Sequence, residues 1–179
     1  MDARGGTRLS ARVPIVASLV LVLAMGLASA AAPPASIPST PVLTAVDPAT
    51  GGAVALDPSQ GPMHLVFLAT WCRPCMAELP RLSDLEDRWK SDGYRVFLIA
   101  VATRQTADRL RDFAASEPLP GKLLFDADGS VAAALSAATI PTHALVDRHG
   151  RIVARSGVLD AAFSQAVERL VRQEGRVKP

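Results

Sequence analysis

The spacing of apolar residues changes period along the chain, and the change marks a junction between a strand and a helix. A continuous apolar run, MHLVFLA at 63–69, is typical of a strand buried on both faces. Residues 73–91 then follow helical spacing, with one face made by Met76, Leu79, Leu82, Leu85 and Trp89. A second apolar run, YRVFLIAVA at 94–102, predicts another buried strand. The pattern therefore predicts a strand–helix–strand unit whose two strands are parallel.

Shorter patterns on either side complete an α/β architecture. Apolar runs at 42–46 and 53–56 flank the turn sequence DPATGG and predict a β-hairpin. Beyond residue 102 the pattern predicts a helix at 105–116, a strand at 122–125, a helix at 130–137, strands at 142–147 and 151–156, and a last helix capped by Asp160. We expect a mixed central sheet with helices on both faces, an N-terminal β-hairpin and a closing antiparallel hairpin.

The first thirty residues have the pattern of an export signal. Three arginines within 4–12 precede an apolar run at 13–32, which contains the cleavage pattern Ala28-Ser29-Ala30. About 20 apolar residues also suffice to cross a bilayer, so a cleaved signal (1–30) and a retained anchor both stay open. In the second case the arginines would stay in the cytoplasm and the rest would lie outside. Pro-rich residues 31–41 predict an extended linker, and the folded domain is expected at 42–175.

Charge and cysteine content narrow the classes of function. Removing three arginines and Asp2 with the leader leaves 16 basic and 16 acidic side chains, so the remainder is formally neutral. It has no basic stripe interleaved with aromatic residues, which argues against nucleic-acid binding. Its length, about 149 residues, suffices for one core without a disulfide. The loop between Cys72 and Cys75 is too short to stabilise the fold much, so chemistry explains the pair better.

The stretch VFLATWCRPCMAELPRL at 66–82 places both cysteines where the first buried strand ends and a helix begins. Free N–H groups and partial positive charge at a helix N-terminus stabilise a thiolate, and Arg73 adds a positive charge. Pro74 suits the first helical turn. Two intervening residues put both thiols within one turn, so they can close and reopen a disulfide. We expect Cys72 to be the exposed attacking thiol and Cys75 the buried resolving thiol.

Metal and haem sites have less support. A zinc site needs four ligands, and the chain offers no second CxxC beside His64, His143 and His149. Of these histidines only His143 is a candidate to lie near the cysteines. The alternative is that His143 is an ordinary strand residue without a role in the site. Haem attachment requires C-x-x-C-H, whereas Met76 follows Cys75. We predict no metal and no other bound cofactor.

The cysteine-containing stretch resembles the active-site segment of the thioredoxin superfamily, above all of exported TlpA/ResA-type thiol–disulfide oxidoreductases. The matching residues around the cysteines are Trp71, Pro74 and Pro80. A second matching segment is TIPTHALVDRHGRIV at 139–153, where the resemblance implies a cis-proline, Pro141, that faces the disulfide. The resemblance covers about residues 40–173. It implies a thioredoxin-like fold, with the N-terminal hairpin as the addition typical of the TlpA type.

The resemblance also implies roles for residues around the cysteines. Thioredoxin has a buried acid six residues before the first cysteine, where this chain has Val66. TlpA/ResA-type proteins instead place a glutamate three residues after the second cysteine, here Glu78. A carboxylate there could raise the thiol pKa and carry the resolving proton; a solvated helix position is the alternative for Glu78. The expected substrate contacts are Trp71 as an exposed rim residue, Arg73, Pro74 and the backbone of Ile140.

These features predict an exported enzyme that reduces protein disulfides through Cys72 and Cys75. Its predicted location is the periplasm or the outer face of the cytoplasmic membrane, with membrane contact only through the N-terminal segment. A reductant there needs a transmembrane thiol electron donor. The expected substrates are exported protein disulfides, with apocytochrome c as one candidate. The chain lacks the G-V-P-E stretch typical of the subgroup for cytochrome c maturation and has TIPTH there instead.

Two alternatives remain open. The first is a disulfide oxidase or isomerase of the same fold. The second is a copper carrier in which Cys72 and Cys75 serve as soft ligands, with His143 as the one candidate for a further ligand. A peroxidase has less support, because neither cysteine has the Pro/Thr-flanked context of a peroxidatic residue.

Overall fold

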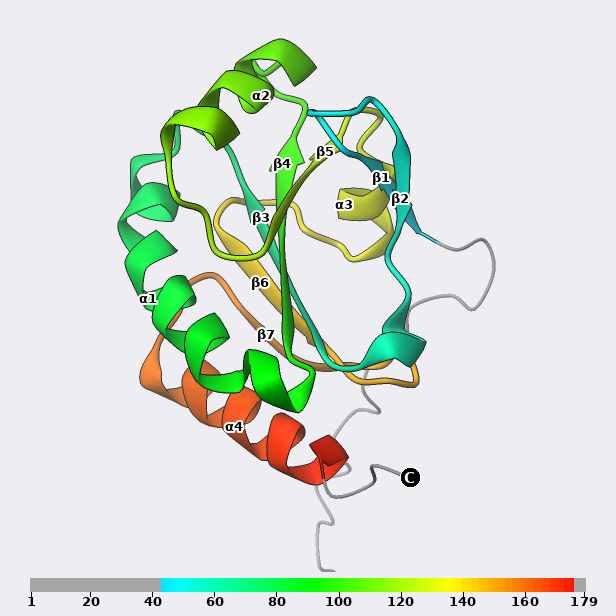
Figure 1. Cartoon of the computed structure of the whole chain (residues 1–179), viewed down its shortest axis with the longest axis vertical. Coiled ribbons are helices and arrows are strands. Elements are labelled where there is room, and N and C mark those ends of the chain that lie inside the picture. The colour runs from blue at the N-terminus through cyan, green and yellow to red at the C-terminus, as the bar shows by residue number, and fades with distance from the viewer. Residues whose placement is uncertain (1–42, 176–179) are drawn as a thin grey trace, which may run out of the picture. The chain divides into compact units, whose positions relative to one another are not determined.

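A mixed β-sheet runs through the part of the chain that the computed structural model describes, residues 43–175. The predicted leader (1–30) and linker (31–41) lie outside these residues. Within 43–175 the sheet has seven strands in the order β2-β1-β5-β4-β3-β6-β7 (Figure 1). None of the helices in this range is long and apolar enough to cross a membrane.

The order of elements agrees with the sequence pattern. The elements are β1 (Thr44–Val46), β2 (Ala53–Ala55), η1 (Pro58–Gln60), β3 (Met63–Leu68), α1 (Arg73–Trp89), η2 (Lys90–Asp92), β4 (Arg95–Val101), α2 (Ala107–Ser116), β5 (Lys122–Asp126), α3 (Ser130–Ala134), β6 (Thr142–Val146), β7 (Ile152–Ser156) and α4 (Ala161–Gly175). The helices are two to three residues shorter than predicted at several ends, but every predicted strand and helix of this range is present.

Strand β3 occupies the centre of the sheet and carries the candidate site at its end. It pairs in parallel with β4, as the apolar runs predict, and antiparallel with β6. All six of its residues are buried, because helices cover both faces of the sheet. In the β3–β6 register Val66 lies directly opposite His143. This pairing brings the strand that leads to the CxxC and the strand that follows Pro141 together.

Hairpins extend the sheet at both edges. The β1–β2 hairpin pairs antiparallel with β5, and the β6–β7 hairpin continues from β3 on the other side. Both hairpins were predicted, and the first one extends the sheet at its N-terminal edge. The central parallel strands β3, β4 and β5 are therefore flanked by antiparallel strands.

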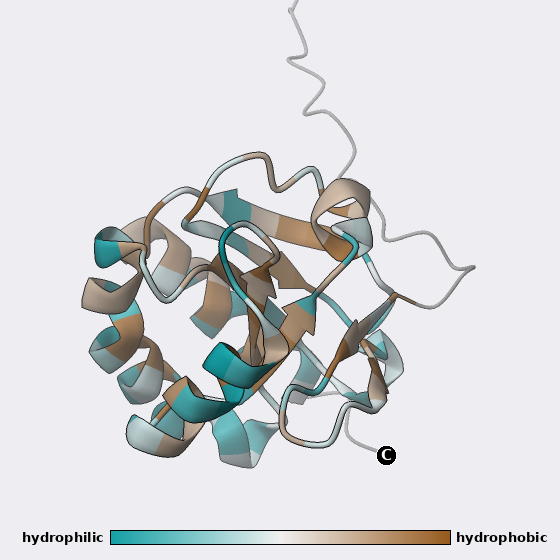
Figure 2. Ribbon diagram, turned by 90° about the horizontal axis from the view of Figure 1, so that it is seen from above, coloured by the Kyte–Doolittle hydropathy of each residue, from teal (hydrophilic) through white to brown (hydrophobic). Residues whose placement is uncertain are grey.

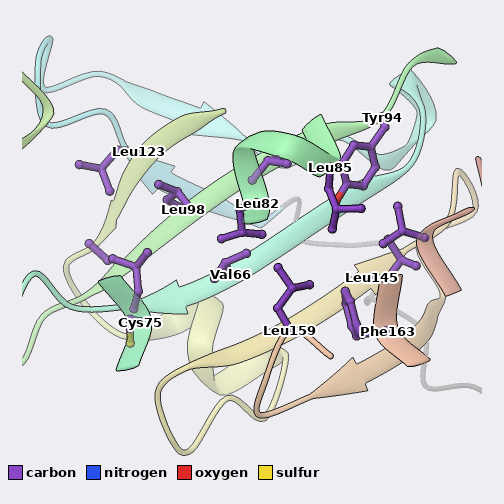
Figure 3. Packing of buried hydrophobic residues seen from close by; sticks show 14 of the residues in the cluster. Val66, Cys75, Leu82, Leu85, Tyr94, Leu98, Leu123, Leu145, Leu159 and Phe163 are labelled. Carbon is purple, nitrogen blue, oxygen red and sulfur yellow. The ribbon is translucent and has the colours of Figure 1, made fainter. Parts of the chain in front are cut away.

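Alternating side chains of β3 divide the core of residues 43–175 between the two faces of the sheet. Val66 and Leu68 face the cluster under α1, α2 and α4, which also contains both cysteines. Figure 3 shows Val66, Cys75 and Phe163 in this cluster. Met63, Leu65 and Phe67 face the cluster that α3 and the N-terminal hairpin cover. Figure 2 shows mainly hydrophobic strands in the middle and helices with hydrophilic stretches around them. Helices on both faces were predicted, and this arrangement is confirmed.

Candidate active site

The Cys72–Cys75 pair lies at the junction of β3 and α1, as predicted. Cys72 is the N-cap residue of α1, and its own N–H donates to the carbonyl of Ala69 at 2.9 Å. The Cys75 amide donates to Cys72 Sγ at 3.3 Å. The two sulfurs form a disulfide, and the Cα atoms are 5.3 Å apart. The Cys72 sulfur thus already accepts a backbone N–H at the positive end of a helix, the contact that stabilises a thiolate once the pair is reduced.

Cys72 is more buried than the sequence indicated, whereas Cys75 is buried as expected. Cys72 is 5% exposed and Cys75 is 2% exposed, so the expectation of an exposed Cys72 is wrong for the disulfide form. The reason is packing, because both cysteines belong to the hydrophobic cluster under α1. The side chains of Arg73 and Pro74 are exposed instead. They form the surface around the start of α1.

Trp71 has an exposed but fixed side chain. It is 44% exposed, as expected for a rim residue. Its indole Nε1 donates to the carbonyl of Thr103 at 2.9 Å. The guanidinium carbon of Arg104 lies 4.3 Å from the centre of the ring, within the range of a cation–π contact. Trp71 therefore presents a fixed apolar surface directly before the cysteine pair.

Ile140 and Pro141 form the second predicted segment of the site. The peptide bond between them is cis, and β6 begins at the next residue. The hydroxyl of Thr142 donates to the carbonyl of Thr139 at 2.6 Å across this turn. Ile140 and Trp71 line one surface pocket of about 400 Å³, together with residues of the loops after β4 and β5. The structure thus brings two of the predicted substrate contacts together.

Glu78 is a buried residue of α1, the helix that carries the cysteine pair. It is 9% exposed, so its interpretation as a solvated helix residue is wrong. One carboxylate oxygen, Oε1, accepts the backbone N–H of Leu159 at 2.7 Å. The other, Oε2, lies 3.0 Å from Nε2 of His143. Cys75 and Glu78 are three residues apart in α1 and therefore share a helix face.

His143 is not the ordinary strand residue that the sequence indicated. It is fully buried, and its Nδ1 lies 3.0 Å from Nε2 of His64. His64 Nδ1 in turn lies 2.6 Å from the hydroxyl of Tyr94. The ring of Phe163 covers both histidines, with ring centres 4.8 Å from His64 and 5.5 Å from His143. A buried hydrogen-bond chain thus runs from Tyr94 to Glu78.

Burial determines the protonation states of the side chains in this hydrogen-bond chain. Desolvation holds the pKa of His64 well below its usual range, and the neighbouring His143 lowers it further. Desolvation also lowers the pKa of His143, although the hydrogen bond and charge of Glu78 and the charge of Asp160 oppose the shift. Burial raises the pKa of Tyr94. At neutral pH both imidazoles and the phenol are therefore uncharged.

The buried chain leaves His143 without a ring nitrogen for a metal, since Glu78 engages one nitrogen and His64 the other. In residues 43–175 no group of three or more metal-ligating side chains comes together. The copper-carrier alternative therefore loses its candidate histidine.

Sequence reasoning missed His64 and Tyr94 as parts of the site. A signal was present, because both His64 and His143 interrupt otherwise apolar strands that are expected to be buried. Buried polar side chains need partners, and two such histidines in neighbouring strands are natural partners. The missing information was the β3–β6 register.

Proteins with similar sequences are named as thiol–disulfide oxidoreductases. A ResA protein of Bacillus cereus is 29% identical over 91 residues, which cover 51% of this chain and 51% of that protein. Sporulation thiol-disulfide oxidoreductase A of Bacillus subtilis is 26% identical over 117 residues, 64% of this chain and 70% of that protein. The chain thus spans about half the length of the ResA proteins it matches.

Solved structures with the same fold confirm the thioredoxin-like prediction. A thiol:disulfide interchange protein of the thioredoxin family from Chlorobium tepidum TLS has a TM-score of 0.64 at 20% identity, covering 79% of this chain and 99% of that one. StoA from Bacillus subtilis has a TM-score of 0.57 at 22% identity, covering 72% and 92%. The AhpC/TSA family profile matches residues 32–155, more than half of the chain. The resemblance to ResA-type proteins is confirmed, and the chain belongs to the AhpC/TSA family of thioredoxin-like proteins.

Proposed function

We propose that this protein is a thiol–disulfide oxidoreductase that reduces protein disulfides through Cys72 and Cys75. The observation that carries the proposal is the disulfide of this pair at the N-terminus of α1. A helix N-terminus favours the thiolate, and the thiolate is the reactive species in disulfide exchange. The names of the ResA and sporulation relatives support the same chemistry.

The reducing reaction takes two steps. The Cys72 thiolate attacks one sulfur of the substrate disulfide, which forms a mixed disulfide and releases the other substrate sulfur as a thiolate. Cys75 then loses its proton, its sulfur attacks Cys72 Sγ, and the second substrate sulfur leaves. Two electrons pass from the cysteine pair to the substrate. The protons of the two cysteine thiols balance those that the two substrate thiolates take up.

Glu78 is the base that we assign to the second step. It shares a helix face with Cys75, it is buried, and its two oxygens are fixed by Leu159 and His143. A carboxylate oxygen has two acceptor positions, so each oxygen keeps one for the Cys75 proton. Glu78 can also return that proton to the departing substrate thiolate.

Replacing Glu78 with glutamine tests this role. Glutamine keeps the size of the side chain and can still accept the Leu159 N–H, but it cannot take a proton. We expect the second step to slow by about 100-fold at neutral pH, while attack by Cys72 is retained. Stopped-flow exchange with a fluorescent disulfide peptide separates the two steps across a pH series.

The control for this substitution is Glu168→Gln. Glu168 lies in α4, and its carboxylate accepts a hydrogen bond from Arg172 Nε at 2.9 Å. We expect this variant to keep the wild-type pH profile. If Glu78→Gln also kept that profile, the base would not be Glu78.

The pocket beside Trp71 is the proposed binding place for a substrate segment. Trp71 and Ile140 line it, and Arg73 and Pro74 form the exposed surface around the start of α1. A disulfide-bearing segment that enters the pocket would rest on the fixed indole ring. The backbone of Ile140, just before β6, is then available for hydrogen bonds to an extended substrate.

Location and electron supply complete the proposal. The arginine-flanked apolar run at 13–32 supports export, either as a cleaved signal or as an anchor. We place the folded domain in the periplasm or on the outer face of the cytoplasmic membrane. A reductant in that compartment depends on a transmembrane thiol donor. Exported protein disulfides are then the substrate class. Apocytochrome c is one candidate substrate, and reduction of its oxidised CxxCH peptide by this protein tests it.

The reduction potential of the Cys72–Cys75 pair tests the direction of exchange. The protein is equilibrated with thiol buffers of known ratio, and its thiols are trapped for mass analysis. We expect a value near or below about −250 mV, on the reducing side of the thioredoxin-like scale. A value near about −120 mV would assign the protein to disulfide formation instead. A pair that never closes would point to metal carriage.

A further inference from the structure

The hydrogen-bond chain that ends on Glu78 has a fixed direction, and Tyr94 determines it. Within residues 43–175 the Tyr94 hydroxyl has one hydrogen-bond partner, Nδ1 of His64, at 2.6 Å. Burial keeps this hydroxyl protonated by raising its pKa. A buried phenol with one available acceptor donates to it, because an unused buried donor is costly. Nδ1 of His64 therefore accepts.

The direction propagates through both rings. A neutral imidazole carries one hydrogen, and a nitrogen that accepts cannot carry it. His64 therefore bears its hydrogen on Nε2 and donates it to Nδ1 of His143, 3.0 Å away. By the same rule His143 bears its hydrogen on Nε2 and donates to Oε2 of Glu78, also 3.0 Å away. One hydroxyl just before β4 thus sets the tautomers of two histidines in other strands.

We propose that Tyr94, His64 and His143 are positioning residues that lock these tautomers, so that Glu78 always receives an N–H from His143 and is held ready to take the Cys75 proton. The inference rests on the proposed exchange reaction. The Leu159 N–H holds the other carboxylate oxygen at 2.7 Å, so two fixed donors orient the group. Figure 3 shows Tyr94 and Cys75 at opposite ends of the cluster under α1.

The proton path in the resolving step stays outside the histidine chain. The Cys75 S–H bond breaks, its proton passes to the remaining acceptor position of a Glu78 oxygen, and the Cys75 sulfur forms its bond to Cys72 Sγ. The substrate sulfur leaves with the electron pair of the mixed disulfide and takes up the proton from Glu78. Neither imidazole gains or loses a proton, so the chain orients the carboxylate and remains uncharged.

Two charged groups act on the ends of the hydrogen-bond chain. The negative charge of Asp160, at the start of α4, raises the pKa of His143, but desolvation outweighs it and the pKa stays below its usual value. The negative charge of Glu86 in α1 raises the pKa of Tyr94 and so helps the hydroxyl to keep its hydrogen. From β3 only His64 faces His143, and the cysteines next to Glu78 are joined as a disulfide.

The tautomers are directly measurable in the wild-type protein. Long-range ¹H–¹⁵N correlation spectra of the oxidised full chain distinguish hydrogen on Nδ1 from hydrogen on Nε2. We expect the Nε2–H form for both His64 and His143 at pH 7.5. His149, which is exposed in the turn between β6 and β7, serves for assignment through its His149→Gln variant. An Nδ1–H form of His143 overturns the proposal.

Tyr94→Phe tests the functional consequence from the far end of the chain. It removes one hydroxyl and leaves both histidines and Glu78 in place. We expect a mixture of tautomers for His64 and a resolving step two- to tenfold slower, about the effect of one hydrogen bond. Attack by Cys72 is expected to keep its wild-type rate. Phe163→Leu is the packing control, because it changes the cover over both rings without removing a donor.

The outcomes separate this inference from the proposed function. A wild-type protein that performs no exchange refutes the proposed function, and the inference with it. Normal wild-type exchange together with an unchanged resolving rate in Tyr94→Phe refutes the inference alone. An equal loss in Tyr94→Phe and Phe163→Leu refutes it as well, since general loosening of the core would then explain both.

Discussion

Replacing Cys72 with alanine is expected to abolish disulfide exchange. Cys72 is the N-cap residue of α1, and its sulfur accepts the Cys75 N–H, so it is the sulfur that the helix N-terminus activates. Without it no mixed disulfide forms, and we expect the exchange rate to fall by a factor on the order of 10³ or more. The measurement is reduction of a fluorescent disulfide peptide with a chemical thiol as electron donor.

Cys75→Ala is the matched variant for this prediction. It keeps the attacking sulfur and removes the resolving one, so the mixed disulfide with substrate should accumulate and be visible by mass spectrometry. Both cysteines belong to the same core cluster, which makes the substitutions comparable in packing. Exchange by Cys72→Ala at the wild-type rate would show that Cys72 is not the nucleophile.

The sequence predicted the elements well because their signals are local. The buried strands β3 and β4 are continuous apolar runs, and Asp160 caps α4 as expected, with its carboxylate accepting the Phe163 N–H at 2.8 Å. Helix ends differ from the predicted ends where a side chain caps the helix. α2 begins at Ala107 instead of 105, because the Thr106 hydroxyl caps it by accepting the Arg109 N–H.

The site was predicted only as far as it depends on spacing along the chain. The CxxC and the proline before β6 are sequence motifs: the cysteines form a disulfide at the start of α1, and the Ile140–Pro141 bond is cis as expected. The surroundings of Glu78 depend instead on contacts with residues 65 and 81 positions away, His143 and Leu159. A helix position with a charged side chain is normally solvated. Only the packing of β6 and α4 against α1 reverses that expectation.

A similar long-range contact supports the loop before the cysteines. Gln105 is buried, and its side-chain oxygen accepts the Thr70 N–H at 2.8 Å while its amide donates to the Val101 carbonyl at 2.6 Å. No local pattern indicates this bridge, because glutamine is common on exposed helix ends. It ties the loop that carries Trp71 to the end of β4.

Mild acid is expected to destabilise the protein through its buried histidines. Burial lowers the folded-state pKa of His64 and His143, whereas in the unfolded chain both titrate near about 6.5. Below that pH the unfolded state binds more protons than the folded state, so the free energy of unfolding falls as the pH falls. The slope approaches about 1.4 kcal/mol per pH unit for each histidine only well below pH 6.5, so the loss for the pair between pH 6.5 and 5.5 is at most about 2 kcal/mol.

Urea unfolding of the oxidised protein at pH values from 7.5 to 5.5 measures this slope. His64→Gln is expected to remove about half of it, because the amide can still hydrogen-bond to Tyr94 and His143 but does not titrate. His149→Gln removes an exposed histidine from the same chain and should keep the wild-type slope. Carboxylates contribute little in this window, since their unfolded-state pKa values lie near about 4. If the free energy of unfolding changed with pH equally in wild type and His64→Gln, the buried histidines would take up protons in the folded state. The proposed hydrogen-bond chain, which requires both imidazoles to be uncharged, would then be excluded.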